Sequence, residues 1–100
     1  MSAINCIDYA TLTVSSTAVG LSSASPTLTA GHTVHRALFT LETDQVRWRA
    51  DGTAPTSTTG HLLNVGDVLD MTDADYKSVL ENIKFIRVTT DAALKITYFD

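Results

Sequence analysis

Apolar and polar residues alternate over short stretches along most of the chain. In residues 34–42, one set of alternate positions holds Ala37, Phe39 and Leu41. Successive side chains of a strand point to opposite faces, so this period predicts a strand with Phe39 and Leu41 turned inward. Residues 7–15, 46–49, 68–71, 85–89 and 94–99 alternate in the same way, although residues 7–15 do not reveal which face is buried. Six or seven short strands at this spacing predict an all-β fold, a small antiparallel β-sandwich or a jelly-roll-like barrel.

Turn-forming residues separate these strands. Asp51-Gly52 ends the strand of residues 46–49, because Gly takes positive φ without steric cost and Asp can bond its own backbone. Residues 43–45 are short enough for a hairpin turn, so we expect strands 34–42 and 46–48 to be antiparallel neighbours. We expect a second hairpin between residues 85–89 and 94–99.

Two segments depart from the strand period. In residues 73–83, apolar side chains recur at helical spacing behind an Asp or Thr cap, which predicts one short helix or helical turn. Residues 15–33 are rich in Ser, Thr, Gly and Ala, and Pro26 and Gly31 interrupt them. We expect a loop, an irregular edge or an extended arm there. The chain of 100 residues has room for one core, so residues 1–100 are expected to form a single domain.

Composition and charge exclude several classes of partner. Phosphate binding needs clustered Lys and Arg, whereas this chain has seven in all and a formal net charge of -4, so we expect no nucleic-acid partner. The N-terminal residues lack the features of a secretory signal and no apolar run is long enough to span a membrane, so we expect cytoplasmic synthesis and no membrane association. Cys6 is the one cysteine, and we expect it to be buried as a small apolar side chain. A chain this short buries about two-thirds of its unfolded surface, which favours a homo-oligomer that shares apolar faces.

The candidate catalytic and metal-binding residues do not match a known arrangement. His32 and His35 would lie on opposite faces of a strand, and neither they nor His61 have a Cys or carboxylate at a supporting zinc spacing. The four aspartates between residues 67 and 75 lack the spacing and central Gly of an EF-hand loop, so we interpret them as turn and helix-end charges. Nucleophile-elbow and phosphate-loop motifs are absent. We expect no enzymatic activity, no cofactor and no metal.

The strand of residues 46–49 carries the main candidates for a binding surface. Val46 and Trp48 share one face of this strand. We favour Trp48 as a core anchor together with Phe39 and Phe85. The alternative is that Trp48 is exposed and binds a partner or a sugar ring. Arg47 and Arg49 then face outward, either as a solvated strand face or as forks that grip carboxylates of a neighbouring subunit. The candidate partner-binding residues are Arg47, Arg49, Asp51, Thr53, Thr56 and Thr58.

Several runs of the sequence resemble small virion proteins of tailed bacteriophages. They are residues 37–42, Val46-Arg-Trp-Arg-Ala-Asp-Gly-Thr-Ala-Pro-Thr, Gly60-His-Leu-Leu, Phe85-Ile-Arg-Val-Thr and Leu94-Lys-Ile-Thr-Tyr-Phe, which cover residues 37–99 in outline. The resemblance implies a β-rich structural component of the virion, either a head decoration or cement protein or a neck or tail subunit. Its partners would be capsid or connector subunits and further copies of itself.

One function from another class remains as an alternative. In a carbohydrate-binding or host-receptor-binding module, Trp48 would be exposed and stack on a sugar ring. Asp51, Asn64 and Asp67 would then bond sugar hydroxyls. The two hypotheses differ in whether Trp48 belongs to the core.

Overall fold

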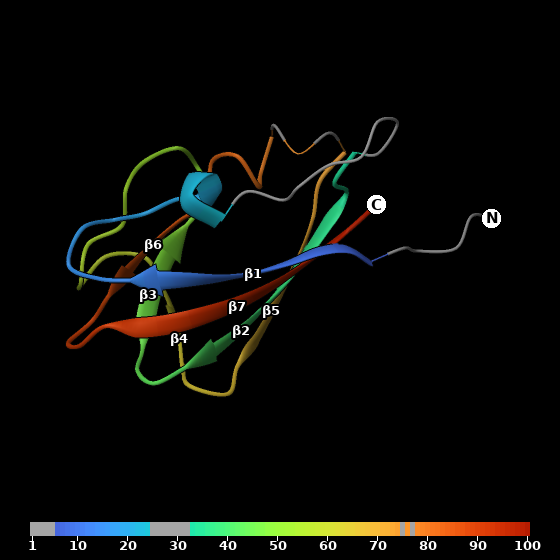
Figure 1. Cartoon of the computed structure of the whole chain (residues 1–100). Coiled ribbons are helices and arrows are strands. Elements are labelled where there is room, and N and C mark those ends of the chain that lie inside the picture. The colour runs from blue at the N-terminus through green and yellow to red at the C-terminus, as the bar shows by residue number, and fades with distance from the viewer. Residues whose placement is uncertain (1–5, 25–32, 75, 77) are drawn as a thin grey trace.

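The chain folds into a sandwich of two antiparallel β-sheets (Figure 1). The structure is a computed structural model that describes residues 6–24, 33–74, 76 and 78–100. Sheet A has the strand order β1-β7-β2-β5, and sheet B has the order β4-β3-β6. The strands are β1 (Cys6–Val14), β2 (Arg36–Glu42), β3 (Val46–Arg49), β4 (His61–Leu63), β5 (Val68–Thr72), β6 (Lys84–Arg87) and β7 (Ala92–Phe99). The predicted all-β class is therefore confirmed.

The core lies between the two sheets and is filled from alternate strand positions. Strand β2 buries Ala37, Phe39 and Leu41, as its period predicts. The rings of Phe39 and Phe85 contact one another across the sandwich, with centroids 5.4 Å apart. Trp48 is only partly buried and packs against the margin of this core. Strand β7 adds four buried side chains, Ala92, Leu94, Ile96 and Tyr98.

Strand β1 shows which of its two faces is buried, which the sequence did not decide. Leu12 and Val14 are buried, whereas Tyr9, Thr11 and Thr13 on the alternate positions are exposed. The register with β7 shifts between Cys6 and Asp8. Such an irregularity changes the face to which the following side chains point. Cys6 itself is exposed, so the expectation that it is buried is wrong.

Both predicted hairpins are wrong, because the chain crosses from one sheet to the other at each turn. Strand β2 pairs with β5 and β7, whereas β3 pairs with β4 and β6. Between β2 and β3, Thr43 has a φ of 84° and the Asp44 amide donates to the Glu42 carbonyl at 3.1 Å. This three-residue γ-turn redirects the chain out of sheet A. Strands β6 and β7 likewise lie in different sheets.

The segment predicted as one short helix or helical turn forms turns and no helix, in the residues that the structure describes. Residues 78–82 are turns, and the Ile83 amide donates to the Val79 carbonyl at 2.9 Å. The buried carboxylate of Asp73 accepts hydrogen bonds from the amides of Val79 and Leu80, at 2.6 and 2.9 Å. It thus satisfies amides in the way that a cap satisfies those of the first turn of a helix. Asp75 lies outside the described residues.

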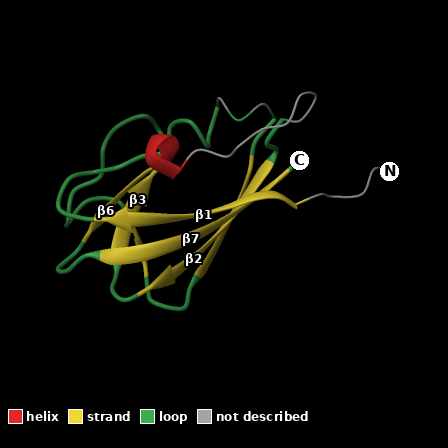
Figure 2. Cartoon of the chain, in the orientation of Figure 1, coloured by secondary structure: helices red, strands yellow, loops and turns green. Residues whose placement is uncertain are grey.

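The expected loop or arm of residues 15–33 is partly attached to sheet B. Val19 and Phe85 exchange two backbone hydrogen bonds of 2.8 Å, and the Arg87 amide donates to the Ser15 carbonyl at 3.1 Å. A short 3-10 helix, η1 (Leu21–Ala24), follows and is drawn in red in Figure 2. Residues 25–32, including Pro26 and Gly31, lie outside the described residues.

Candidate functional site

The connection between β3 and β4 holds four of the six candidate partner-binding residues. Asp51, Thr53, Thr56 and Thr58 are all exposed on it, and Arg47 and Arg49 precede it on β3. Of residues 51–59, all but Pro55 are exposed. We refer to residues 51–59 as the threonine loop. Its backbone is held by hydrogen bonds from the Arg47 side chain, from the Asp51 carboxylate and between Thr56 and Thr59.

Arg47 holds the threonine loop against the outer face of sheet B. Its Nε donates to the carbonyl of Ser57 at 3.0 Å, and its Nη1 donates to the carbonyl of Gly60 at 3.0 Å. The guanidinium fork is thus occupied within its own chain. That Arg47 contacts a carboxylate of a neighbouring subunit stays a prediction.

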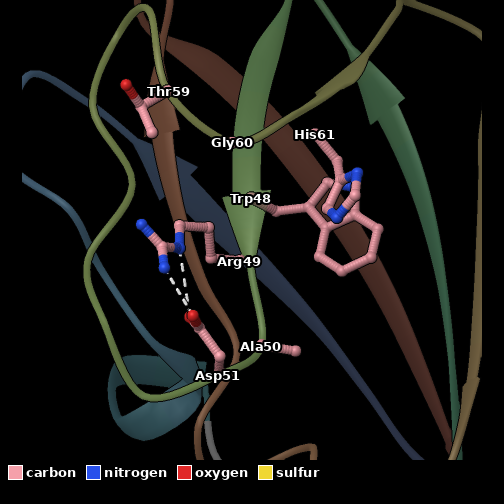
Figure 3. A pocket seen from close by; sticks show the side chains of 7 residues that line it. All are labelled: Trp48, Arg49, Ala50, Asp51, Thr59, Gly60 and His61. Atoms are coloured by element: carbon pink, nitrogen blue, oxygen red, sulfur yellow. Dashed lines mark hydrogen bonds and ion pairs between the residues drawn. The ribbon is translucent and has the colours of Figure 1, made fainter.

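Arg49 is paired with the first residue of the loop. Its Nε donates to Asp51 Oδ1 at 3.1 Å, and its Nη2 bonds the other carboxylate oxygen. Figure 3 shows the two side chains together on one side of β3. The hydrogen bond from Arg49 lowers the pKa of Asp51 below its ordinary value, with a smaller lowering from the Thr53 amide. The positive charge of Arg49 is therefore already paired.

The tip of the loop is a miniature hairpin. The amides and carbonyls of Thr56 and Thr59 bond each other at 2.9 and 3.2 Å, with Ser57 and Thr58 forming the turn. Buried Pro55 packs behind this tip against Gly60, which has a φ of 131°. A Cβ at Gly60 would lie 3.2 Å from the Pro55 Cβ and 3.0 Å from the Trp48 carbonyl oxygen. A side chain at this position would therefore strain the closure of the loop.

An open hollow of about 550 Å³ lies at the base of the loop, lined by Trp48, Arg49, Ala50, Asp51, Thr59, Gly60 and His61. The rings of Trp48 and His61 lie together with centroids 4.6 Å apart. Figure 3 shows this aromatic pair on one side of β3 and the Arg49–Asp51 pair on the other. The polar side chains around the hollow thus do not converge on a common point.

The structure does not bring the other proposed sugar-binding residues to this hollow. Asn64 and Asp67 belong to the turn between β4 and β5, and the side chain of Asp67 accepts the Asn64 amide at 2.8 Å. Asn64 Oδ1 also accepts a hydrogen bond from Gln45 Nε2 at 2.6 Å. These side chains stabilise the turn, and neither lines the hollow with Trp48.

The other titratable residues singled out in the sequence are also separate from one another. Asp70 accepts two hydrogen bonds from Arg36, at 2.8 and 2.7 Å, and this interaction lowers the pKa of Asp70. His35 Nδ1 lies 3.7 Å from a carboxylate oxygen of Asp100. His32 lies outside the described residues. Within the described ranges, no group of three His, Cys, Asp or Glu residues could hold a metal ion, and no helix is long and apolar enough to cross a membrane.

The sequence reasoning missed the residues that fix the loop. Pro55, Ser57 and Gly60 are not among the residues predicted as a binding surface. One signal was available: a glycine directly before the strand residues His61-Leu62-Leu63 indicates a close backbone approach where the chain returns to a strand. The partner of Arg47 has no such signal, because a carbonyl group is present at every residue.

Comparisons with known protein families, curated proteins and solved structures gave no match to this chain.

Proposed function

We propose that the chain is a non-enzymatic structural protein of a tailed-phage virion that binds neighbouring subunits through the threonine loop. A capsid decoration or cement protein is the first candidate, and a neck or tail subunit is the second. The resemblance of residues 37–99 to small phage virion proteins supports the setting. One observation supports binding to neighbouring subunits: the tip of the threonine loop is exposed and uncharged, and hydrogen bonds within the chain hold its backbone.

The loop has the physical properties of a protein contact. Arg47 and the miniature hairpin hold its backbone before any partner arrives, so binding would lose little conformational entropy. The hydroxyls of Thr53, Thr56 and Thr58 supply donors and acceptors without a charge that must be desolvated. Of the two loop-facing arginines, one is bonded to carbonyls and the other to Asp51. The surface offered to a partner is therefore polar but close to neutral.

A particle would strengthen such a contact by repetition. One small loop buries too little surface for tight binding as an isolated pair. On a symmetric lattice, each copy that is held by a second contact meets its next partner at a high effective concentration. Weak loop contacts can then sum to stable attachment.

Mass spectrometry of purified particles tests whether the chain is a component of the virion. We expect the chain to be present in particles of the phage that encodes it, at a copy number that separates a shell component from a ring of about a dozen subunits. If the chain is recovered only as free protein after particle purification, the proposal fails.

A cosedimentation experiment tests the loop. In a variant that carries Thr53→Asp, Thr56→Asp and Thr58→Asp, we expect binding to particles to fall at least tenfold, because three carboxylates would need to be desolvated. The control is Thr72→Asp, which places a single added carboxylate at an exposed end of β5 in sheet A. Equal loss in both variants, or none in the loop variant, would count against the threonine loop as the contact.

A carbohydrate- or receptor-binding module is the alternative from another class of function, because Trp48 stays partly exposed beside the hollow. A glycan array with the wild-type chain and a folded Trp48→Ala variant tests it. Glycan binding that Trp48→Ala removes would favour this function over the virion role.

A further inference from the structure

Strand β1 forms one edge of sheet A. It pairs with β7 along its length, and the sheet continues from β7 through β2 to β5 (Figure 1). Among the described residues, no strand pairs with β1 on its other side. In an antiparallel strand, the amides and carbonyls of alternate residues point away from the paired neighbour. Strand β1 therefore presents a row of backbone donors and acceptors at this edge.

This edge lacks the features that normally prevent strands of different molecules from pairing. Residues 9–14 read Tyr-Ala-Thr-Leu-Thr-Val and contain no charged residue, Pro or Gly. The register shift between Cys6 and Asp8 affects only the beginning of the strand. Natural edge strands are usually blocked by charges, prolines, bulges or short length. A stretch of uncharged residues with Tyr9 58% exposed is the opposite of such a blocked edge.

The other sheet edges are blocked. Strand β5 carries Asp70 in the middle of its five residues, and β4 has only three residues. The edge of β6 is covered by the backbone of residues 15–19, which bonds Phe85 and Arg87. The contrast singles out β1 as the edge that is long, uncharged and not paired with another strand within the described chain, although the short helix η1 contacts this strand.

We propose that β1 is a self-association site, at which the β1 strands of two copies of this chain pair antiparallel about a two-fold axis. The two four-stranded sheets would then form one continuous sheet. A second copy fits because the strand is self-complementary. In any register centred between Ala10 and Thr11, Asp8 faces an uncharged residue of β1, one of those between Leu12 and Val14.

The side chains also match in a two-fold pair. The exposed set Tyr9, Thr11 and Thr13 would meet the same set of the partner copy, and aromatic–Thr and Thr–Thr pairs across strands are favourable. The combined sheet would end at β5 on both sides, where Asp70 opposes addition of a further copy. The association would therefore stop at a dimer.

This inference identifies the self-contact within the assembly role proposed above, and its test requires no particle. Sedimentation equilibrium of the full chain measures the mass directly. For the wild type we expect a species of twice the 10.8 kDa chain mass. In a Tyr9→Lys, Thr13→Lys variant we expect the dimer dissociation constant to rise at least tenfold, because lysines at an edge oppose pairing. The matched control, Thr72→Lys at the β5 edge, is expected to dimerise like the wild type.

Hydrogen exchange gives a second measurement that does not depend on a substitution. The amides of residues 9–14 that point away from β7 should exchange more slowly at high protein concentration than at low concentration. A wild type that stays monomeric at about 100 μM, well above the dissociation constants of specific dimers, would overturn the inference. Concentration-independent protection of these amides would do so as well, since the chain itself would then cover the edge.

The outcomes also separate this inference from the proposed function. In one outcome, the wild type dimerises, the Tyr9→Lys, Thr13→Lys variant does not, and the chain is absent from particles. This result would support the self-association site and refute the virion role. A particle-bound chain that is monomeric in solution would refute the self-association site alone.

Discussion

Replacing Arg47 by Met should loosen the threonine loop and destabilise the chain, whereas the same change at Arg49 should have a much smaller effect. The two arginines lie on the same face of β3, two residues apart. Arg47 makes two hydrogen bonds of 3.0 Å, to the carbonyls of Ser57 in the loop and of Gly60 directly after it, and the second is partly buried. Arg49 makes an exposed pair with Asp51. Met keeps most of the aliphatic length of Arg, so the change removes chiefly the guanidinium donors.

The magnitude follows from those two bonds. A hydrogen bond to a charged group contributes about 1.5–3 kcal/mol when well shielded, and exposure of the Ser57 contact reduces its share. We therefore expect Arg47→Met to lower the free energy of unfolding by about 2 kcal/mol. For a domain of this size, that corresponds to a decrease in Tm of about 10 °C. Exposed ion pairs such as that of Arg49 contribute little, because solvent screens them.

Urea denaturation of the two variants measures the free energies, and hydrogen exchange locates the change. We expect the Thr56 and Thr59 amides to exchange faster in Arg47→Met and to be nearly unchanged in Arg49→Met, because these amides close the loop tip. Equal destabilisation by the two substitutions would refute the assignment of Arg47 as the residue that holds the loop. Unchanged exchange at Thr56 and Thr59 in Arg47→Met would refute it too.

Four further substitutions test other parts of the fold. Phe39→Ala should lower the free energy of unfolding by about 3–5 kcal/mol, measured in urea, because its fully buried ring leaves a cavity. Gly60→Ala should lower it by about 1–3 kcal/mol, since the new Cβ meets Pro55 and backbone oxygen; no loss would show that the loop can shift. Thr43→Gly should raise the thermal midpoint, because a β-branched residue at a φ of 84° is strained. The hydrogen bond from Arg36 lowers the pKa of Asp70 in the fold. This pair therefore stabilises the folded chain at pH values above the ordinary carboxyl pKa of about 4, and the stabilisation is lost as the pH falls below that value. Asp70→Asn should therefore reduce the acid dependence of stability between pH 5 and 2, measured as urea midpoints.

The strands and much of the core could be predicted because they depend on local periodicity. Alternation placed Phe39 and Leu41 on the buried face of β2, and the structure confirms both. A period of two residues is set by the strand itself, whichever strand lies beside it. In β1, both sets of positions hold apolar and hydroxyl-bearing residues, so periodicity could not select the buried face.

The crossings between sheets could not be predicted, because a hairpin and a crossing have the same local signature. The three residues between β2 and β3 can reverse the chain within one sheet or pass it to the other, and alternation in both strands is the same in either case. One cue argued against the hairpin: residues 43–45 lack the Gly or Asn that two-residue hairpin turns favour. Whether the chain forms a hairpin or crosses between sheets depends on the pairing of β2 with β7 and of β3 with β6, and the strands of each pair are distant in sequence.

The crossing at Thr43 also determines what the two proposed contact surfaces can do together. It places β3 and the threonine loop on sheet B, while β1 forms an edge of sheet A. Two copies joined at β1 would therefore present two threonine loops, each carried by the sheet that does not contain the paired strands. A dimer with two free loops can bind two sites of a repeating particle, and the second contact then forms at high effective concentration. The Tyr9→Lys, Thr13→Lys variant, whose loop is unchanged, should accordingly dissociate from particles at least tenfold faster than the wild type. Equal dissociation rates for this variant and the wild type would mean that the loop contact does not depend on dimerisation.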